Sequence, residues 1–168
     1  KNVLKSIEKI TSKSGLGISQ KRIVVSTSGV PKMIKKIADL GVKFKLAVSL
    51  HSAISEKRTS IMPFNEKMNL SELQESLNYW YKKTKEIITY EYVVWEGVND
   101  TDADISALVE FCKKTPSKVN LIHYNNIDDE NFVQASSNIL SKYIKILESN
   151  KIKATIRKSR GQDIDAAC

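Results

Sequence analysis

The sequence predicts an α/β fold: a partial barrel of about five parallel strands. Short apolar, β-branched segments alternate with amphipathic helical segments along the chain, which is typical of parallel strands joined by right-handed crossovers. Only five strand segments are present, which is too few for a closed eight-stranded barrel. The first helical segment has no strand before it, and the last strand has no helix after it. We therefore expect part of a larger barrel, truncated at both ends.

Length and composition indicate one ordinary globular domain. The chain has 168 residues, of which 41% are hydrophobic and 27% are charged. No low-complexity tract or internal linker interrupts the pattern, so we expect residues 1–168 to form part of a single domain. No apolar run approaches the roughly 20 residues that a membrane-spanning helix needs. The first residues also lack a signal-peptide pattern.

The first half of the chain predicts helix, strand, helix, strand and helix. The strands are short β-branched or alternating runs at 22–27 and 44–50. The helical faces are Val3, Leu4, Ile7 and Ile10, then Met33, Ile34, Ile37 and Leu40, then Leu70, Leu73, Leu77, Trp80 and Tyr81. Pro31 suits a first helical turn and Gly41 a helix end. Asn69 and Glu72 match a capping box, and a long loop is expected over Ala53–Met68.

The second half continues the alternation. Strands are predicted at 87–95, 118–124 and 152–157, with an acidic loop at 126–134. Thr101 and Asp104 match a helix cap with an acid in the first turn. The two helical faces are Ile105, Leu108, Val109 and Cys112, then Ile139, Leu140, Tyr143, Ile144 and Leu147. Because Cys112 lies on an apolar face, we expect it to be a buried, unreactive thiol.

Charge and cysteine content restrict the class of protein. The net charge is +8, which favours a polyanionic partner, with nucleic acid as the first candidate. Two cysteines, Cys112 and Cys168, are too few for a disulfide scaffold, so we expect a reducing, cytoplasmic location. They are also too few to hold a four-iron cluster, which takes several thiolates.

Polar side chains follow every predicted strand. Ligands of α/β barrels and open parallel sheets bind at the carboxyl ends of the strands. The five ends carry Ser26-Thr27-Ser28, Ser49-His51-Ser52, Glu96-Asn99-Asp100, His123-Asn125-Asn126 and Arg157-Ser159-Arg160. Five converging polar ends predict a mouth that binds a polar ligand.

The end of the chain is the most specific feature. After the last strand come basic residues, Gly161, two aspartates and a terminal cysteine. The run R-K-S-R-G-Q-D-I-D-A-A-C, residues 157–168, resembles the terminal signature of the radical-SAM adenine-C2 methyltransferases of ribosomal RNA, the RlmN/Cfr family. The resemblance covers nearly the whole chain, and it implies that the barrel is the second part of a radical-SAM core. It also implies that Cys168 is the catalytic methyl carrier.

The resemblance extends to the strand ends. S-T-S-G implies that Ser26 contacts S-adenosylmethionine, and S-L-H implies the same for Ser49, Leu50 and His51. Asn125 follows the L-I-x-x element, and the resemblance implies that it also contacts S-adenosylmethionine. The sequence departs from the family around Asn125, where the usual prolines are replaced by His123 and Asn126.

The family's chemistry follows as an expectation. One S-adenosylmethionine methylates Cys168, a second is cleaved at a [4Fe-4S] cluster to a 5′-deoxyadenosyl radical, and the resulting S-methyl radical adds to C2 of adenine. The cluster ligands and the second redox cysteine lie upstream in the family and are absent here, so the isolated chain is expected to be inactive. The implied partners are 23S ribosomal RNA, transfer RNA as a further substrate, and a reductant such as flavodoxin. We expect a monomer.

RNA contact is predicted for the basic residues around the last strand: Lys151, Lys153, Arg157, Lys158 and Arg160. Three alternatives remain open. One is methylation at C8, which the wider family also performs. Another is a non-catalytic RNA-binding module that stacks bases on Tyr90, Tyr92 and Trp95. The third is a barrel enzyme that clamps a phosphorylated metabolite with Arg157 and Arg160.

Overall fold

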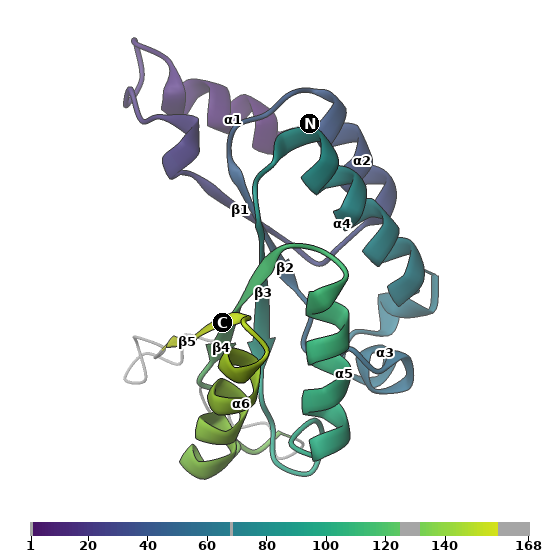
Figure 1. The fold of residues 1–168 in the computed structure, drawn as a ribbon. Helices are drawn as coiled ribbons and strands as arrows, with labels where there is room; N and C mark the ends of the chain where they lie inside the picture. The colour runs from purple at the N-terminus through teal and green to yellow at the C-terminus, as the bar shows by residue number, and fades with distance from the viewer. Residues whose placement is uncertain (1, 68, 125–131, 158–168) are drawn as a thin grey trace.

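A computed structural model describes residues 2–67, 69–124 and 132–157. Its centre is one parallel sheet with the strand order β1-β2-β3-β4-β5 (Figure 1). The strands are β1 Val24–Thr27, β2 Lys45–Ser49, β3 Ile88–Val93, β4 Ser117–Ile122 and β5 Lys153–Arg157. Every pairing joins strands that are consecutive in sequence, so each connection is a crossover of the βαβ type. The predicted partial α/β barrel is confirmed.

The helices pack mainly on one face of the sheet, as Figure 1 shows for α2, α4 and α5. They are α1 Asn2–Thr11, α2 Pro31–Asp39, α3 Ser55–Ile61, α4 Leu70–Thr84, α5 Asp102–Lys113 and α6 Ser137–Ser149. Two short 3-10 turns accompany them, η1 Gln20–Arg22 and η2 Pro63–Lys67. Among the described residues, no helix combines the length and apolar character needed to cross a membrane.

The core lies between the sheet and these helices. Alternate residues of β2, β3 and β4 point into it, as period-two geometry requires. From the strands it receives Leu46, Val48, Ile88, Tyr90, Tyr92, Val119, Leu121 and Ala154. The helices contribute chiefly Ile34, Leu73, Leu77, Trp80, Ile105, Leu108, Leu140, Tyr143 and Leu147. The predicted apolar faces of the last three long helices are therefore confirmed, except that Tyr81 of α4 is not part of this core.

The opposite face of the sheet, here called the inner face, is polar over most of its area. It is formed by the intervening strand residues: Val24, Ser26, Lys45, Ala47, Ser49, Thr89, Glu91, Val93, Lys118, Asn120, Ile122, Lys153, Thr155 and Arg157. The pairings arrange them in rows across the strands. Ala47, Thr89, Lys118 and Lys153 form one row with Ser26, and Ser49, Glu91, Asn120 and Thr155 form the next.

Several helix ends follow the sequence signals. Pro31 occupies the first turn of α2, and Gly41 has a left-handed φ of 63° just beyond its end. Asn69 caps α4 by accepting a hydrogen bond from the Glu72 N–H. The reciprocal pair of a complete capping box occurs instead at Thr101 and Asp104 of α5.

Two local predictions were wrong. The stretch predicted as a long loop, Ala53–Met68, contains α3 and η2. Its helix has seven residues and is organised around a buried charged side chain rather than an apolar stripe, so periodicity did not reveal it. On the first two predicted helical faces, Val3, Met33 and Leu40 are 56%, 45% and 57% exposed, and Leu40 lies just beyond the end of α2. Ile7 and Ile34 are the buried residues of these faces.

The position of Cys112 makes the first testable prediction. The thiol is buried between α5 and the sheet, and burial raises its pKa to about 12. At pH 8 its thiolate fraction is then about one in ten thousand, against about a quarter for an ordinary cysteine. In a Cys168→Ser variant, whose remaining thiol is Cys112, Ellman's reagent should therefore react only after unfolding in urea. Labelling of the folded variant at the rate of a free thiol would contradict this burial.

Candidate active site

The carboxyl ends of the strands bring the predicted polar residues to one edge of the sheet. Ser49 ends β2, and the chain then turns sharply through Leu50 and His51. Arg157 ends β5 on the same edge, paired with Ile122 of β4. Ser26 lies on the inner face one row below Ser49, because it pairs with Ala47. This edge is where α/β barrels place their ligands.

The turn at His51 is held from both sides. His51 has a left-handed φ of 56°, which is uncommon for a residue with a side chain. Its Nδ1 accepts a hydrogen bond of 3.2 Å from the Val93 N–H. Burial, with a smaller contribution from the positive charge of Arg58, lowers the pKa of His51 to about 4. The ring is therefore neutral at pH 7, and because Nδ1 is an acceptor, Nε2 holds the proton and is a donor.

Asn99 fixes the ends of β2 and β3 relative to each other. The residue is buried, and its side-chain amide donates to the carbonyls of His51, at 2.6 Å, and Val93, at 2.8 Å. Its Oδ1 accepts from the Trp95 N–H at 2.8 Å. The Tyr143 hydroxyl donates in turn to the Asn99 carbonyl. Several hydrogen bonds therefore restrain the backbone at His51, and together they maintain its unusual φ.

Arg58 of α3 is the second fixed point. Its side chain is 1% exposed and donates to carbonyls at the ends of two strands: Leu50 from Nε at 3.2 Å, and Ser28 and Ser49 from Nη2 at 2.9 and 3.4 Å. Nη1 donates to Asn65. Burial lowers the pKa of Arg58 to about 10, so the guanidinium remains charged at neutral pH. One side chain therefore ties together the turns that follow β1 and β2.

Gly29 completes the turn after β1. Its φ is 97°, a conformation that residues with a side chain rarely adopt, and a Cβ there would lie 3.0 Å from the Leu73 side chain. The Gly29 N–H donates to the Thr27 hydroxyl at 3.1 Å. The glycine of the S-T-S-G segment thus allows β1 to turn tightly over α4.

An aromatic cluster borders the strand ends on the β3–β4 side. Trp95 packs against His51, Tyr124 and Phe132, with ring centroids 5.7, 5.9 and 5.0 Å apart. Val93 and Ile122 of the inner face join this cluster. The strand-end edge therefore combines an apolar aromatic wall with the hydroxyls and imidazole of the β1–β2 side, a composition typical of small-molecule sites.

The residues predicted to contact S-adenosylmethionine differ in how far they are exposed to solvent. Ser26 is exposed on the inner face, and Ser49 and His51 are partly buried. Leu50 is fully buried; its N–H donates to the Glu91 carbonyl and its own carbonyl accepts from Arg58. The side chain of Leu50 is therefore part of the core, and its position sets the backbone between Ser49 and His51. Asn125 and Cys168 lie outside the described residues.

The predicted RNA contacts divide between two edges. Lys151 precedes β5 and Lys153 begins it, so both lie near the amino-terminal edge of the sheet, where Lys153 pairs with Lys118. Arg157 lies at the carboxyl edge with the candidate site. Lys158 and Arg160 lie outside the described residues. Of the described basic residues in this set, Arg157 is therefore the one placed beside the strand-end site.

Sequence reasoning did not identify Arg58 and Asn65 as site residues, and it named Asn99 only as one of the polar strand ends, without its role in fixing the turn. Arg58 and Asn65 fell in the stretch expected to be a loop, and Asn99 fell in a turn, where asparagine is common for local reasons.

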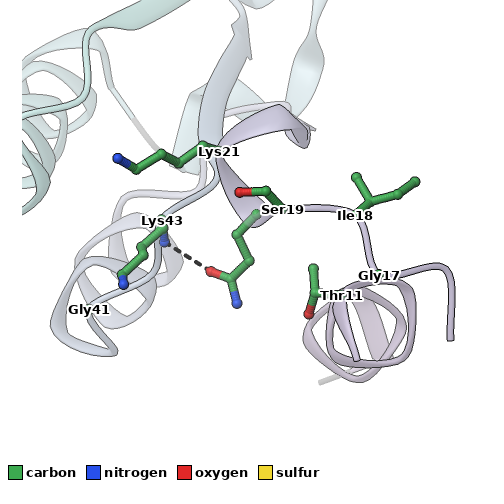
Figure 2. Close-up of a pocket in the computed structure, with 8 residues that line it drawn as sticks. Thr11, Gly17, Ile18, Ser19, Lys21, Gly41 and Lys43 are labelled. Carbon is green, nitrogen blue, oxygen red and sulfur yellow. Dashed lines mark hydrogen bonds between the residues drawn. The ribbon is translucent and has the colours of Figure 1, made fainter. Parts of the chain in front are cut away.

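A polar hollow lies at the opposite, amino-terminal edge of the sheet (Figure 2). It is lined by Thr11, Gly17, Ile18, Ser19, Gln20, Lys21, Gly41 and Lys43. The Lys43 N–H donates to the Gln20 side chain across it at 3.1 Å. These residues precede β1 and β2, so the hollow is separate from the strand-end site.

The residues present do not fit an iron–sulfur cluster. The whole sequence contains two cysteines, and Cys112 is buried in the core. Within residues 2–67, 69–124 and 132–157, no group of three histidine, cysteine or acidic side chains is arranged to hold a metal ion. A four-iron cluster usually takes more thiolates than this chain possesses.

Known structures define the class of the fold. Over 99% of its length the chain superposes on about half of a radical SAM methyltransferase from Sphaerobacter thermophilus, with a TM-score of 0.94 and 34% identity. A domain of a pyruvate-formate lyase-activating enzyme from Bacteroides vulgatus, of which 90% is covered, shares the fold with a TM-score of 0.68 and 18% identity. The chain thus has the α/β fold of a radical-SAM methyltransferase.

Sequence comparison gives the particular relatives. Over 167 residues the chain is 64% identical to a protein of Flavobacterium psychrophilum named as a probable dual-specificity RNA methyltransferase, RlmN. No protein-family model matches the chain. By sequence, the chain is a relative of the RlmN RNA methyltransferases over 99% of its length, and it spans about half the length of these curated relatives.

Arg58 makes a stability prediction. Replacing it with methionine removes the donor from several buried carbonyls, each of which costs about 1–3 kcal/mol when unpaired. Arg58→Met should lower the free energy of unfolding of the 168-residue chain by about 3 kcal/mol or more. Arg58→Lys should also destabilise, because a single ammonium cannot reproduce the planar fork.

Urea denaturation measures the effect, with the exposed Arg22 as the matched control. Arg22→Met should change the free energy of unfolding by less than about 0.5 kcal/mol. If Arg58→Met and Arg22→Met gave equal midpoints, Arg58 would not organise the strand ends.

His51 makes a pH prediction. Its pKa is about 4 in the folded chain, below the ordinary value of 6.5. Between pH 6.5 and 4 the unfolded chain binds a proton that the folded chain does not, so the free energy of unfolding should fall as the pH falls. The loss is at most about 3 kcal/mol. Urea midpoints from pH 7 to 4.5 should decline less steeply for His51→Gln than for the wild type. Parallel curves for the two proteins would refute the buried neutral imidazole.

Proposed function

We propose that this chain forms the second part of the radical-SAM core domain in a cytoplasmic RNA methyltransferase. The enzyme would methylate C2 of an adenine in 23S ribosomal RNA, and in transfer RNA as a second substrate. The observation that supports this most directly is the fixed turn at the end of β2, where Ser49 and His51 are held by Arg58 and Asn99. The name and similarity of the relatives support the reaction class.

The described residues fit a nucleoside-containing ligand. S-adenosylmethionine, when bound, supplies an activated methyl group on a sulfonium. Ser26 and Ser49 offer hydroxyls at the inner face, and His51 offers an Nε2 donor fixed by the Val93 contact. Asn125 is proposed as a further contact. The cluster ligands would come from outside this chain, because its own residues do not fit a cluster.

Cys168 is proposed as the methyl carrier. Its thiolate attacks the sulfonium methyl group; the new S–C bond forms as the sulfonium S–C bond breaks, and the electron pair remains on the departing neutral thioether. Adenine C2 is not nucleophilic, so an ordinary transfer directly to that carbon would fail. A carrier cysteine therefore fits the methylation of such a carbon better than a one-step transfer.

RNA would meet the site at the carboxyl edge of the sheet. Arg157 is the described cation placed there, and Lys158 and Arg160 are proposed to extend the contact along the phosphate backbone. The rival module that stacks bases on Tyr90 and Tyr92 is contradicted, because both rings are fully buried on the helix-covered face. A flavodoxin-type reductant and a monomeric state complete the proposal.

The two cysteines provide the test. In the full-length protein expressed with S-adenosylmethionine available, a methyl mass increment should appear on the peptide that contains Cys168 and not on the peptide that contains Cys112. Cys168→Ala should abolish RNA methylation, whereas Cys112→Ala should retain it. Peptide mass spectrometry and methyl transfer to RNA give the two readouts. An active Cys168→Ala enzyme would remove the carrier mechanism.

A further inference from the structure

Glu91 is the one acid among the described strand residues of the inner face, whose other polar residues carry hydroxyls, amides and cations. It lies in the middle of β3, one strand away from Ser49, with which it is paired in the sheet. Neighbouring strands are about 4.8 Å apart, and residues at one level point to the same face. Glu91 therefore lies beside the hydroxyl of Ser49.

A hydrogen-bonded chain holds one oxygen of this carboxylate. Asn120 of β4 donates from Nδ2 to Glu91 Oε1 at 3.0 Å, and the Thr155 hydroxyl of β5 donates to Asn120 Oδ1 at 2.9 Å. The three side chains occupy one row across three strands. The contact with Thr155 orients the Asn120 amide, and Asn120 in turn holds Glu91 Oε1 on the side that faces β4.

The other oxygen lacks a partner. Glu91 Oε2 is buried, and no donor among the described residues reaches it. Buried carboxylate oxygens are normally hydrogen-bonded, because an unmet acceptor of this kind is costly. The last torsion of a glutamate side chain is soft, so a small rotation can turn this oxygen toward a donor on the inner face. The missing donor is accordingly best supplied by a ligand.

The position of Ser26 and Ser49 defines where such a ligand lies. A molecule that contacts both hydroxyls must pass above Ala47, because Ser26 pairs with Ala47 and Ser49 is two residues further along the same strand. Ala47 has the smallest side chain of the inner face. On the far side of this path, β3 presents Thr89 opposite Ala47 and Glu91 opposite Ser49. Glu91 thus flanks any ligand held by the two serines.

We propose that Glu91 binds the ribose of the nucleoside ligand, with Oε2 accepting a hydrogen bond from a ribose hydroxyl. This inference rests on the proposed function, which places S-adenosylmethionine between Ser26 and Ser49. A carboxylate is an acceptor only, and dinucleotide-binding α/β folds also use a carboxylate to bind a ribose hydroxyl. The Asn120–Thr155 chain positions the carboxylate for that contact.

The test is a binding cycle in the full-length protein, with S-adenosylhomocysteine and its 2′-deoxy and 3′-deoxy analogues as probes. Calorimetry gives a dissociation constant for each ligand with the wild type, Glu91→Ala and Glu91→Gln. In the wild type, loss of the contacted hydroxyl should weaken binding about tenfold or more, as expected for a hydrogen bond to a charged group. In Glu91→Ala the same loss should have little effect, and Glu91→Gln should lie between the two.

The matched control is Glu75→Ala, which removes an exposed acid from α4, away from the strand ends. It should retain the wild-type discrimination between the probes. Equal hydroxyl effects in the wild type, Glu91→Ala and Glu91→Gln would overturn the ribose contact; should Glu91→Ala fail to fold, Glu91→Gln decides alone. If the wild type itself bound no S-adenosylhomocysteine, the proposed function would fail instead, so the two failures are distinguishable.

Discussion

The strand-end site depends on one buried guanidinium. Arg58 comes from a short helix between β2 and α4, yet it donates to the carbonyls of Ser28, Ser49 and Leu50, which lie at or just beyond the ends of two different strands. These carbonyls lie where the regular pairing of the strands ends. Because buried carbonyls require donors, the turns after β1 and β2 can exist in this form only while Arg58 is in place. The buried positive charge of Arg58 is tolerated because its N–H groups donate hydrogen bonds to these carbonyls.

Asn99 performs the same task on the other side of His51. Its amide bonds the carbonyls of His51 and Val93, while the His51 ring receives the Val93 N–H. The left-handed backbone at His51 is thereby enclosed between an asparagine from the β3–α5 loop and an arginine from α3. Burial lowers the pKa of His51, and the positive charge of Arg58 lowers it further by disfavouring a second positive charge nearby. Geometry and electrostatics thus both give a neutral imidazole whose Nε2–H has a fixed direction.

Much of this architecture followed from the sequence, and the exceptions have a common cause. Leu73, Leu77 and Trp80 lie every three or four residues and packed as expected, as did Ile105, Leu108 and Cys112. Patterns of that kind report burial of apolar surface. The helix at Ser55–Ile61 was missed because its buried residue is Arg58. Met33 was assigned to the core, but it is exposed, and Ile34 and Ala38 are the residues of α2 in the core. Ser26, Ser49 and His51 were indicated by strand-end position and resemblance. Asn99 was indicated by position alone, and its role, like that of Arg58, became clear only from the hydrogen bonds.

The polar inner face explains why this sheet differs from the usual parallel sheet. Parallel strands are commonly buried on both faces and are then apolar throughout. Here Ser49, Glu91, Asn120 and Thr155 form a polar row at one level of four strands, with hydrogen bonds joining the last three. Such a row contributes less to the core than apolar residues would, and it leaves a buried carboxylate oxygen without a donor. The polar row and the rigid turn of Ser49, Leu50 and His51 lie next to each other, and neither of them improves the packing of the helices. We infer that this part of the sheet is organised to bind a polar ligand.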